Sequence, residues 1–184
     1  VAAERTRAAG ELTKAHYAKD HDDPHREEVL ATTVVPADHT FTTRATLDLG
    51  DRLVTLLHPG RGHTAGDLVV HVPDADAVLA GDLVEESAPP VLGPDSYPLE
   101  WPGSLQVVAD LLTDDTVVVP GHGAVVDRAF VVDQQAMLGL VADTIRELVA
   151  AQVPEADALP SATWPWPDDV LATAVSRGYE HLTR

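Results

Sequence analysis

The chain has 184 residues, 45% of them hydrophobic, so it is long enough to bury the core of one domain. Its formal charge of −18 repels nucleic-acid phosphates and anionic lipids, which argues against binding to nucleic acid or to a membrane surface. Cysteine is absent, so disulfides, thiolate metal sites and a cysteine nucleophile are excluded, and any metal must be held by nitrogen and oxygen.

The first half of the chain predicts one helix and a pair of strands. We expect a helix at 2–19, followed by a polar loop with a proline at 20–28. Strands are expected at 43–49 and 53–58, joined by a hairpin turn at Gly50-Asp51. No apolar run reaches the roughly 18 residues that cross a bilayer, and no signal-peptide pattern is visible, so a cytoplasmic location is expected.

The second half alternates strands and helices. Strands are expected at 67–72, 77–80 and 117–119, the last as a short buried strand. Helices are expected from Trp101, where Pro102 suits the first turn, at 130–152, and from Pro167 onward. Residues 153–184 then form a C-terminal strap, rich in proline, and a helix.

Three polar residues follow predicted strands. His63 comes after 53–58, Asp82 after 77–80 and His122 after 117–119, and each has a glycine beside it. Such residues are expected on tight loops at the rim of a sheet. Histidine nitrogens with a carboxylate oxygen suit zinc, which lowers the pKa of a bound water to about 7. The sequence therefore predicts a zinc site at His63, Asp82 and His122.

Structural roles stay open as alternatives for these residues. His63 could cap a turn, and Asp82 could end its strand with an Asp-turn. Thr64 and Asp67 are expected to brace the loop by hydrogen bonds rather than to touch a substrate.

Further histidines lie in the segment HYAKDHDDPH, at 16–25. A solvated, charged loop is the favoured interpretation of this segment, ahead of a metal site.

Three short motifs, in order, resemble those of a known family. GHTAGD (62–67), VLAGD (78–82) and VVPGHG (118–123), with the hairpin before them and WPGSL at a helix start, resemble the metallo-β-lactamase superfamily. The resemblance spans about 36–152. It implies an α/β (α+β) fold, the four-layer αββα sandwich of that family, N-terminally incomplete, in a single domain at 1–184.

The resemblance also implies roles for the three residues. His63 would complete a three-histidine zinc site, Asp82 would bridge two metals, and His122 would complete the second site. Aspartate at position 82, where some β-lactamases carry cysteine, is similar to the pattern of glyoxalase II and general hydrolases. The family's leading motif, His-x-His-x-Asp-His, is absent from the 184 residues, and the chain is expected to start just after it.

Together these features predict a zinc-dependent hydrolase, with this chain a fragment of the full enzyme. A metal-bound hydroxide would attack a carbonyl-type small molecule, namely an ester, lactone, thioester or β-lactam, and Asp82 would orient it as the catalytic residue. The cofactor would be one or two zinc ions, with iron or manganese as alternatives. The alternative function is a non-catalytic binding or partner subunit with a degenerate metal site. The expected partner is a second copy in a homo-oligomer or a complementing N-terminal segment.

Overall fold

The computed structural model describes residues 2–183, which divide at Thr42–Thr43 into two compact units. The first unit holds α1 (Ala2–Tyr17) and α2 (Arg26–Ala31). The predicted helix at 2–19 is confirmed. The predicted loop at 20–28 is wrong at its end, because α2 begins at Arg26 inside it. Two glutamates in the first turn of α2 stabilise the positive end of this short helix.

The histidines of the first unit lie in contact with solvent. His16, His21 and His25 are exposed, and the α2 helix has no buried residue. The segment is solvated, as the sequence favoured, but its first two residues belong to α1 rather than to a loop.

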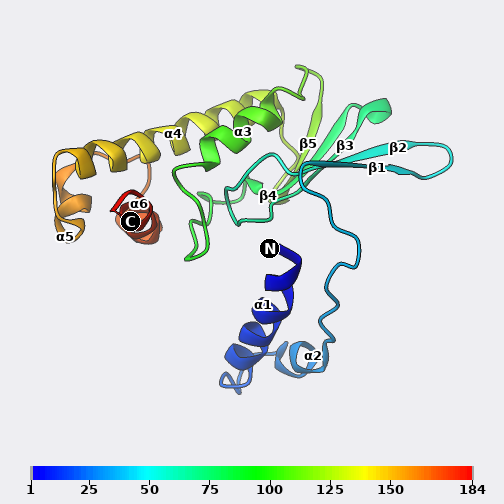
Figure 1. Ribbon diagram of the computed structural model, residues 1–184, viewed down its shortest axis with the longest axis horizontal. Helices are drawn as coiled ribbons and strands as arrows, with labels where there is room; N and C mark the ends of the chain where they lie inside the picture. The colour runs from blue at the N-terminus through cyan, green and yellow to red at the C-terminus, as the bar shows by residue number, and fades with distance from the viewer. Residues whose placement is uncertain (1, 184) are drawn as a thin grey trace. The chain divides into compact units, whose positions relative to one another are not determined.

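The second unit is built on a five-stranded sheet with strand order β1-β2-β3-β4-β5 (Figure 1). Neighbouring strands from β1 to β4 run antiparallel, and β5 runs parallel to β4. Each predicted strand overlaps an observed one. The strands are β1 (Arg44–Asp48), β2 (Leu53–Leu57), β3 (Val69–Val72), β4 (Ala77–Glu85) and β5 (Val117–His122).

The turns between the first strands agree with the sequence. At the β1–β2 hairpin, Gly50 adopts φ +96°, a left-handed conformation that glycine adopts without strain. The predicted turn between β3 and β4 forms a 3-10 turn, η1 (Pro73–Ala75), which ends at Asp76 with φ +43°. Asp76 accepts hydrogen bonds from the hydroxyls of Thr113 (3.0 Å) and Thr116 (2.6 Å), which join this turn to the start of β5.

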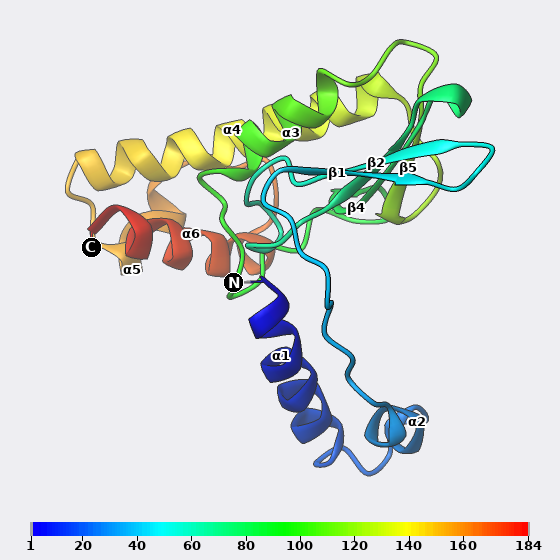
Figure 2. The same cartoon turned by 45° about the vertical axis from the view of Figure 1, so that its right-hand side comes forward.

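Two helices cover one face of the sheet. Helices α3 (Trp101–Ala109) and α4 (Arg128–Ala150) lie side by side along it (Figures 1 and 2). Both were predicted within two or three residues. The core lies between this face and the helices, where the strand residues Val69, Val78 and Val118 are fully buried. Burying such side chains supplies most of the favourable free energy of folding.

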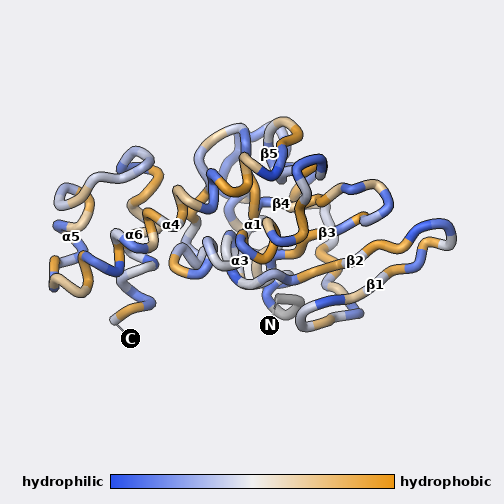
Figure 3. Tube along the Cα trace, turned by 90° about the horizontal axis from the view of Figure 1, so that it is seen from above, coloured by the Kyte–Doolittle hydropathy of each residue, from blue (hydrophilic) through white to orange (hydrophobic). Residues whose placement is uncertain are grey.

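The opposite face of the sheet is apolar at every paired position. Leu79, for example, lies between Val70 on β3 and Val119 on β5. Exposed members are Leu47 (45%), Leu79 (43%), Val117 (44%) and Val119 (37%), and much of the trace of β2 has the hydrophobic colour in Figure 3. We call this surface the open face. Its residues are Ala45, Leu47, Val54, Leu56, Val70, Val72, Ala77, Leu79, Val117 and Val119.

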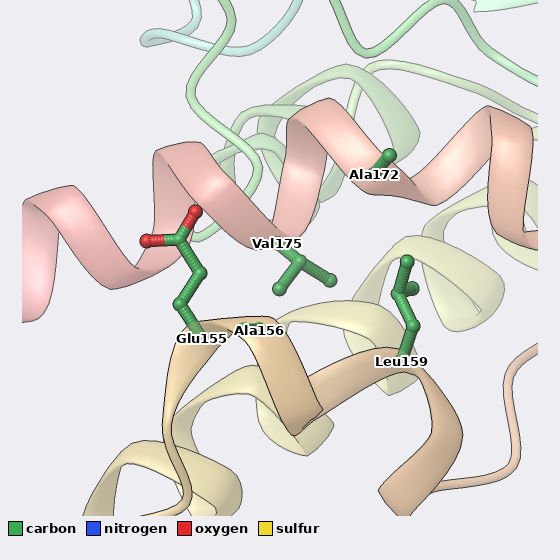
Figure 4. A pocket seen from close by; sticks show the side chains of 5 residues that line it. All are labelled: Glu155, Ala156, Leu159, Ala172 and Val175. Atoms are coloured by element: carbon green, nitrogen blue, oxygen red, sulfur yellow. The ribbon is translucent and has the colours of Figure 1, made fainter.

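The C-terminal segment packs on α4. It holds α5 (Glu155–Ala158), η2 (Leu159–Ser161) and α6 (Asp168–Thr183). A methyl group on Gly178 of α6 would lie 2.6 Å from Ile145 Cγ2, so the two helices are in close contact there. A pocket of about 470 Å³ opens between α5, η2 and α6, lined mostly by apolar side chains (Figure 4). None of the predicted ligands lines it.

Among residues 2–183, no helix combines the length and the apolar character that a membrane crossing requires. The prediction of one domain at 1–184, with a strap and helix at 153–184, stays a prediction.

Candidate metal centre

His63 lies on the connection between β2 and β3, and two glycines shape this loop. Gly60 has φ +137°, which side-chain-bearing residues rarely adopt. A Cβ on Gly62 would lie 2.7 Å from Leu83 Cδ2 and 2.9 Å from Trp101. The loop backbone therefore lies directly on β4 and α3, and it places His63 at the rim of the sheet with 23% of its side chain exposed.

Thr64 and Asp67 brace the same loop, as predicted. The Asp67 carboxylate accepts hydrogen bonds from the Thr64 backbone N–H at 2.9 Å and from its hydroxyl at 2.6 Å. Burial raises the pKa of Asp67, and the two hydrogen bonds from Thr64 partly offset that rise. His58 is structural too, because its Nδ1 atom lies 2.7 Å from the Asp67 carbonyl oxygen.

Asp82 lies inside β4 rather than after it. The predicted strand at 77–80 was too short, because β4 continues to Glu85. Its pairing with β5 is irregular on both sides of Gly81, which has φ +54°. A register shift of this kind re-aims a side chain without ending the strand. The Asp82 side chain is 42% exposed, whereas the three residues that follow it in β4 are buried.

His122 is the last residue of β5, between two glycines that are in close contact with β4. A methyl group on Gly121 would collide with Asp82 Oδ1, and one on Gly123 would collide with the Glu86 carboxylate. The His122 carbonyl accepts a hydrogen bond from Glu86 N at 2.9 Å. The strand end is thus held firmly, while the His122 side chain is 66% exposed.

The three predicted residues meet at one point of the rim. His63 Nε2 lies 3.8 Å from Asp82 Oδ2, and His122 Nε2 lies 3.5 Å from Asp82 Oδ1. Each histidine therefore faces a different oxygen of the same carboxylate. The three side chains are not yet closed around a common centre: in the described range 2–183, no three His, Asp or Glu side chains are grouped tightly enough to hold an ion.

The donor chemistry of this group fits a metal ion. Two imidazole nitrogens and a carboxylate are the ligand types that zinc takes in catalytic sites. Both Asp82 and His122 are substantially exposed, at 42% and 66% of their side chains.

Sequence reasoning missed Glu85, which lies next to His63. Its side chain is only 4% exposed, and Oε1 lies 3.7 Å from His63 Nδ1. Burial raises the pKa of Glu85, and a hydrogen bond from the Val91 N–H partly offsets this rise. The only sequence signal was a carboxylate three residues after Asp82 with the apolar pair Leu83-Val84 between them.

Trp101 packs in the core rather than lining an open pocket. It is fully buried, and its indole N–H donates to the Leu83 carbonyl at 3.1 Å. The ring also meets the His63 imidazole edge-on, with centroids 5.7 Å apart. Its contribution to the site is therefore to support the loop and the strand that carry His63 and Asp82.

The site lies in a strongly acidic part of the chain. Between Arg61 and Arg128 there are twelve Asp and Glu residues and no Lys or Arg. This stretch contains all three predicted ligands, and Glu85 and Glu86 follow Asp82 at the rim, so the carboxylates there favour cations.

The comparisons with known proteins place the fold in a metal-dependent hydrolase family. The model of the metallo-beta-lactamase superfamily matches residues 3–122, and the chain belongs to this superfamily. A curated relative from Bacillus cereus, a metallo-beta-lactamase type 2, is 37% identical over 84 residues, which is 45% of this chain and 33% of the relative. The chain thus matches about a third of that protein's length.

Solved structures agree on the fold. A crystal structure of the DIM-1 metallo-beta-lactamase aligns with a TM-score of 0.51 and 27% identity, covering 58% of this chain and 50% of that one. A metallo-beta-lactamase from Pontibacter korlensis aligns with a TM-score of 0.52 and 27% identity, covering 61% and 53%. The predicted α+β fold of the metallo-β-lactamase type is confirmed.

Proposed function

We propose that this chain carries part of the active site of a zinc-dependent hydrolase and acts as part of a longer enzyme. One observation carries the proposal: the Nε2 atoms of His63 and His122 face the two oxygens of Asp82. The family supports hydrolysis in general terms. The match to about a third of the Bacillus cereus relative supports a longer enzyme.

His63 and His122 would hold the metal through Nε2, and Asp82 through its carboxylate. When bound, zinc lowers the pKa of water and polarises a carbonyl oxygen, and iron or manganese could supply the same chemistry. Asp82 lies between the two histidines, where its carboxylate can orient an attacking water and accept its proton. It is the catalytic residue of the proposal, and the cofactor it would help to hold is one or two metal ions.

The substrate we propose is a small molecule with a hydrolysable carbonyl. Esters, lactones, thioesters and β-lactams all contain such a carbonyl. The relatives are named as metallo-beta-lactamases, so a β-lactam is included among the substrates to be tested. Residues 84–100 comprise the end of β4 and the connection from β4 to α3 beside the site, and we assign them to the substrate wall.

Zinc binding tests the proposal directly. We expect the wild-type chain to bind zinc in a competition titration with a chromogenic chelator, and His63→Ala and His122→Ala each to weaken binding at least tenfold. His39→Ala is the matched control, because His39 is an exposed histidine paired only with Asp38 in the described structure. Equal affinities for all four proteins would contradict the assignment. A wild-type chain that takes up no zinc would contradict zinc binding by this chain alone, and would fit both a non-catalytic subunit and an enzyme whose site another segment completes.

Hydrolysis is then measured on matched substrates. A chromogenic cephalosporin, a nitrophenyl ester, a lactone and a thioester are assayed with and without zinc, using the wild-type chain and Asp82→Asn. We expect any zinc-dependent turnover to be lost in Asp82→Asn. Turnover that persists in this variant would remove Asp82 from the catalytic role.

The open face is the surface through which we propose that the chain associates. An exposed apolar sheet face favours contact with another apolar surface, and flat aliphatic faces are complementary to one another. The chain by itself is therefore expected to form homo-oligomers, and a segment that supplies a second sheet would compete for the same face.

Charge placed on the open face tests this association. Val119→Lys is expected to shift the chain toward monomer in analytical ultracentrifugation. Val125→Lys is the control, because Val125 is 60% exposed but lies after β5, outside the open face. Equal association of the two variants would show that another surface is used.

A further inference from the structure

Glu85 is a buried carboxylate whose backbone is held by α4. Its N–H donates to Gln134 Oε1 at 3.1 Å, and Gln134 Nε2 donates to the Leu83 carbonyl at 2.8 Å. The Gln134 side chain therefore makes hydrogen bonds to the backbone of Leu83 and Glu85 that a neighbouring strand would otherwise make. An ionised carboxylate is costly to bury without partners, so the Glu85 side chain is expected to have groups that stabilise it.

The Glu85 carboxylate has two neighbours. Oε2 accepts a hydrogen bond from the Val91 N–H at 3.2 Å, and Oε1 lies 3.7 Å from His63 Nδ1. The same Nδ1 lies 3.1 Å from the Val91 carbonyl oxygen. Glu85, the two peptide groups of Val91 and the His63 imidazole thus form a closed set of contacts.

This set determines which imidazole nitrogen carries the proton. A neutral imidazole has one N–H, and both groups that face His63 Nδ1 are acceptors. The proton is therefore favoured on Nδ1, which leaves the lone pair on Nε2, the atom that faces Asp82. Glu85 is not itself placed as a ligand of the same ion, because it lies at the Nδ1 side of the ring.

We propose that Glu85 is a positioning residue for His63: with the Val91 peptide groups, it fixes the ring and the tautomer that presents Nε2 to a metal. This inference rests on the proposed metal-binding role of His63. Carboxylates that support a ligating histidine in this way commonly change metal affinity 10–100-fold when removed.

The first readout is the tautomer of His63 in metal-free protein. Long-range ¹H–¹⁵N spectra at about pH 9, above the ordinary histidine range, distinguish Nδ1–H from Nε2–H. We expect the Nδ1–H form in the wild type and in Asp95→Asn, a charge control at an exposed carboxylate of the same connection. Glu85→Ala is expected to give a mixture of both tautomers.

The second readout is zinc affinity, measured by competition with a chelator on the same proteins. We expect Glu85→Ala to bind zinc 10–100-fold more weakly than the wild type, and Asp95→Asn to match the wild type. Glu85→Gln is expected to lie between, because its amide oxygen can still accept the Val91 N–H while the negative charge is gone.

The outcomes separate this inference from the proposed function. A wild-type chain that binds no zinc contradicts zinc binding by this chain alone, while the tautomer measurement still decides the role of Glu85. If Glu85→Ala keeps the Nδ1–H form and a zinc affinity within twofold of wild type, Glu85 has no positioning role. Should Glu85→Ala fail to fold, the isosteric Glu85→Gln decides, and an affinity within twofold of wild type then overturns the inference.

Discussion

Gly121 offers a quantitative test of how closely β4 and β5 approach at the site. An added Cβ would collide with Asp82 Oδ1 and would lie 2.8 Å from both the Asp82 backbone nitrogen and the Gly81 carbonyl carbon. Two of these atoms belong to the backbone, so relief requires the strands to separate. Overpacking of this kind destabilises a fold by about 1–3 kcal/mol. Replacing glycine by alanine also lowers the conformational entropy of the unfolded chain, which offsets about 0.4–1 kcal/mol of this loss. Gly121→Ala should therefore destabilise the fold by about 1–2 kcal/mol.

The assay is urea unfolding followed by circular dichroism, with Gly139→Ala as the matched control. Gly139 lies within α4, and nothing lies within 4 Å of a Cβ built there. Alanine is favoured over glycine inside a helix by about 0.5–1 kcal/mol, so this variant should be more stable than wild type. If Gly121→Ala proves as stable as Gly139→Ala, the close contact between β4 and β5 at Asp82 is refuted.

Two further predictions concern the helices that support the site. Asp127 caps α4 by accepting a hydrogen bond from the Phe130 N–H at 2.9 Å. Asp127→Ala should therefore lower the free energy of unfolding by about 1 kcal/mol in the same urea assay. An unchanged urea midpoint would show that the cap does not stabilise the fold. Burial, aided by the charge of Arg177, lowers the pKa of His181 below its ordinary 6.5. As the pH falls through 6.5, the unfolded chain takes up a proton that the folded chain resists, so stability should fall until the folded pKa is passed. His181→Phe should flatten that part of the curve of stability against pH, and an unchanged slope would contradict the assigned cause.

Much of the fold could be predicted because strand and helix patterns here are strong. The strand at 117–119 is a run of three valines, but the expectation that it is buried is wrong for two of them: Val118 is fully buried, while Val117 and Val119 are 44% and 37% exposed. β4 was predicted too short because Gly81 and Asp82 look like a strand end. Tertiary pairing with β5, through an irregular register, carries the strand on to Glu85.

The candidate site could be predicted only in part. His63, Asp82 and His122 were found because each is polar, follows an apolar run and has a glycine beside it. Glu85 was not found, because a carboxylate in the sequence VEES looks like a surface residue, and only its contacts across the fold reveal its burial. Gln134 was missed for a similar reason: its partner atoms are backbone groups about fifty residues away.

The acidic stretch that contains the three candidate ligands has a kinetic consequence for the proposed hydrolase. Twelve carboxylates without a Lys or Arg between Arg61 and Arg128 create a negative potential that reaches beyond contact distance in dilute buffer. The Debye length is about 30 Å at 0.01 M salt and about 8 Å at 0.15 M, so salt shortens the range of this field strongly. An anionic substrate approaches against the field, whereas a neutral ester does not. The preference for neutral over anionic substrates is therefore expected to grow as the ionic strength is lowered.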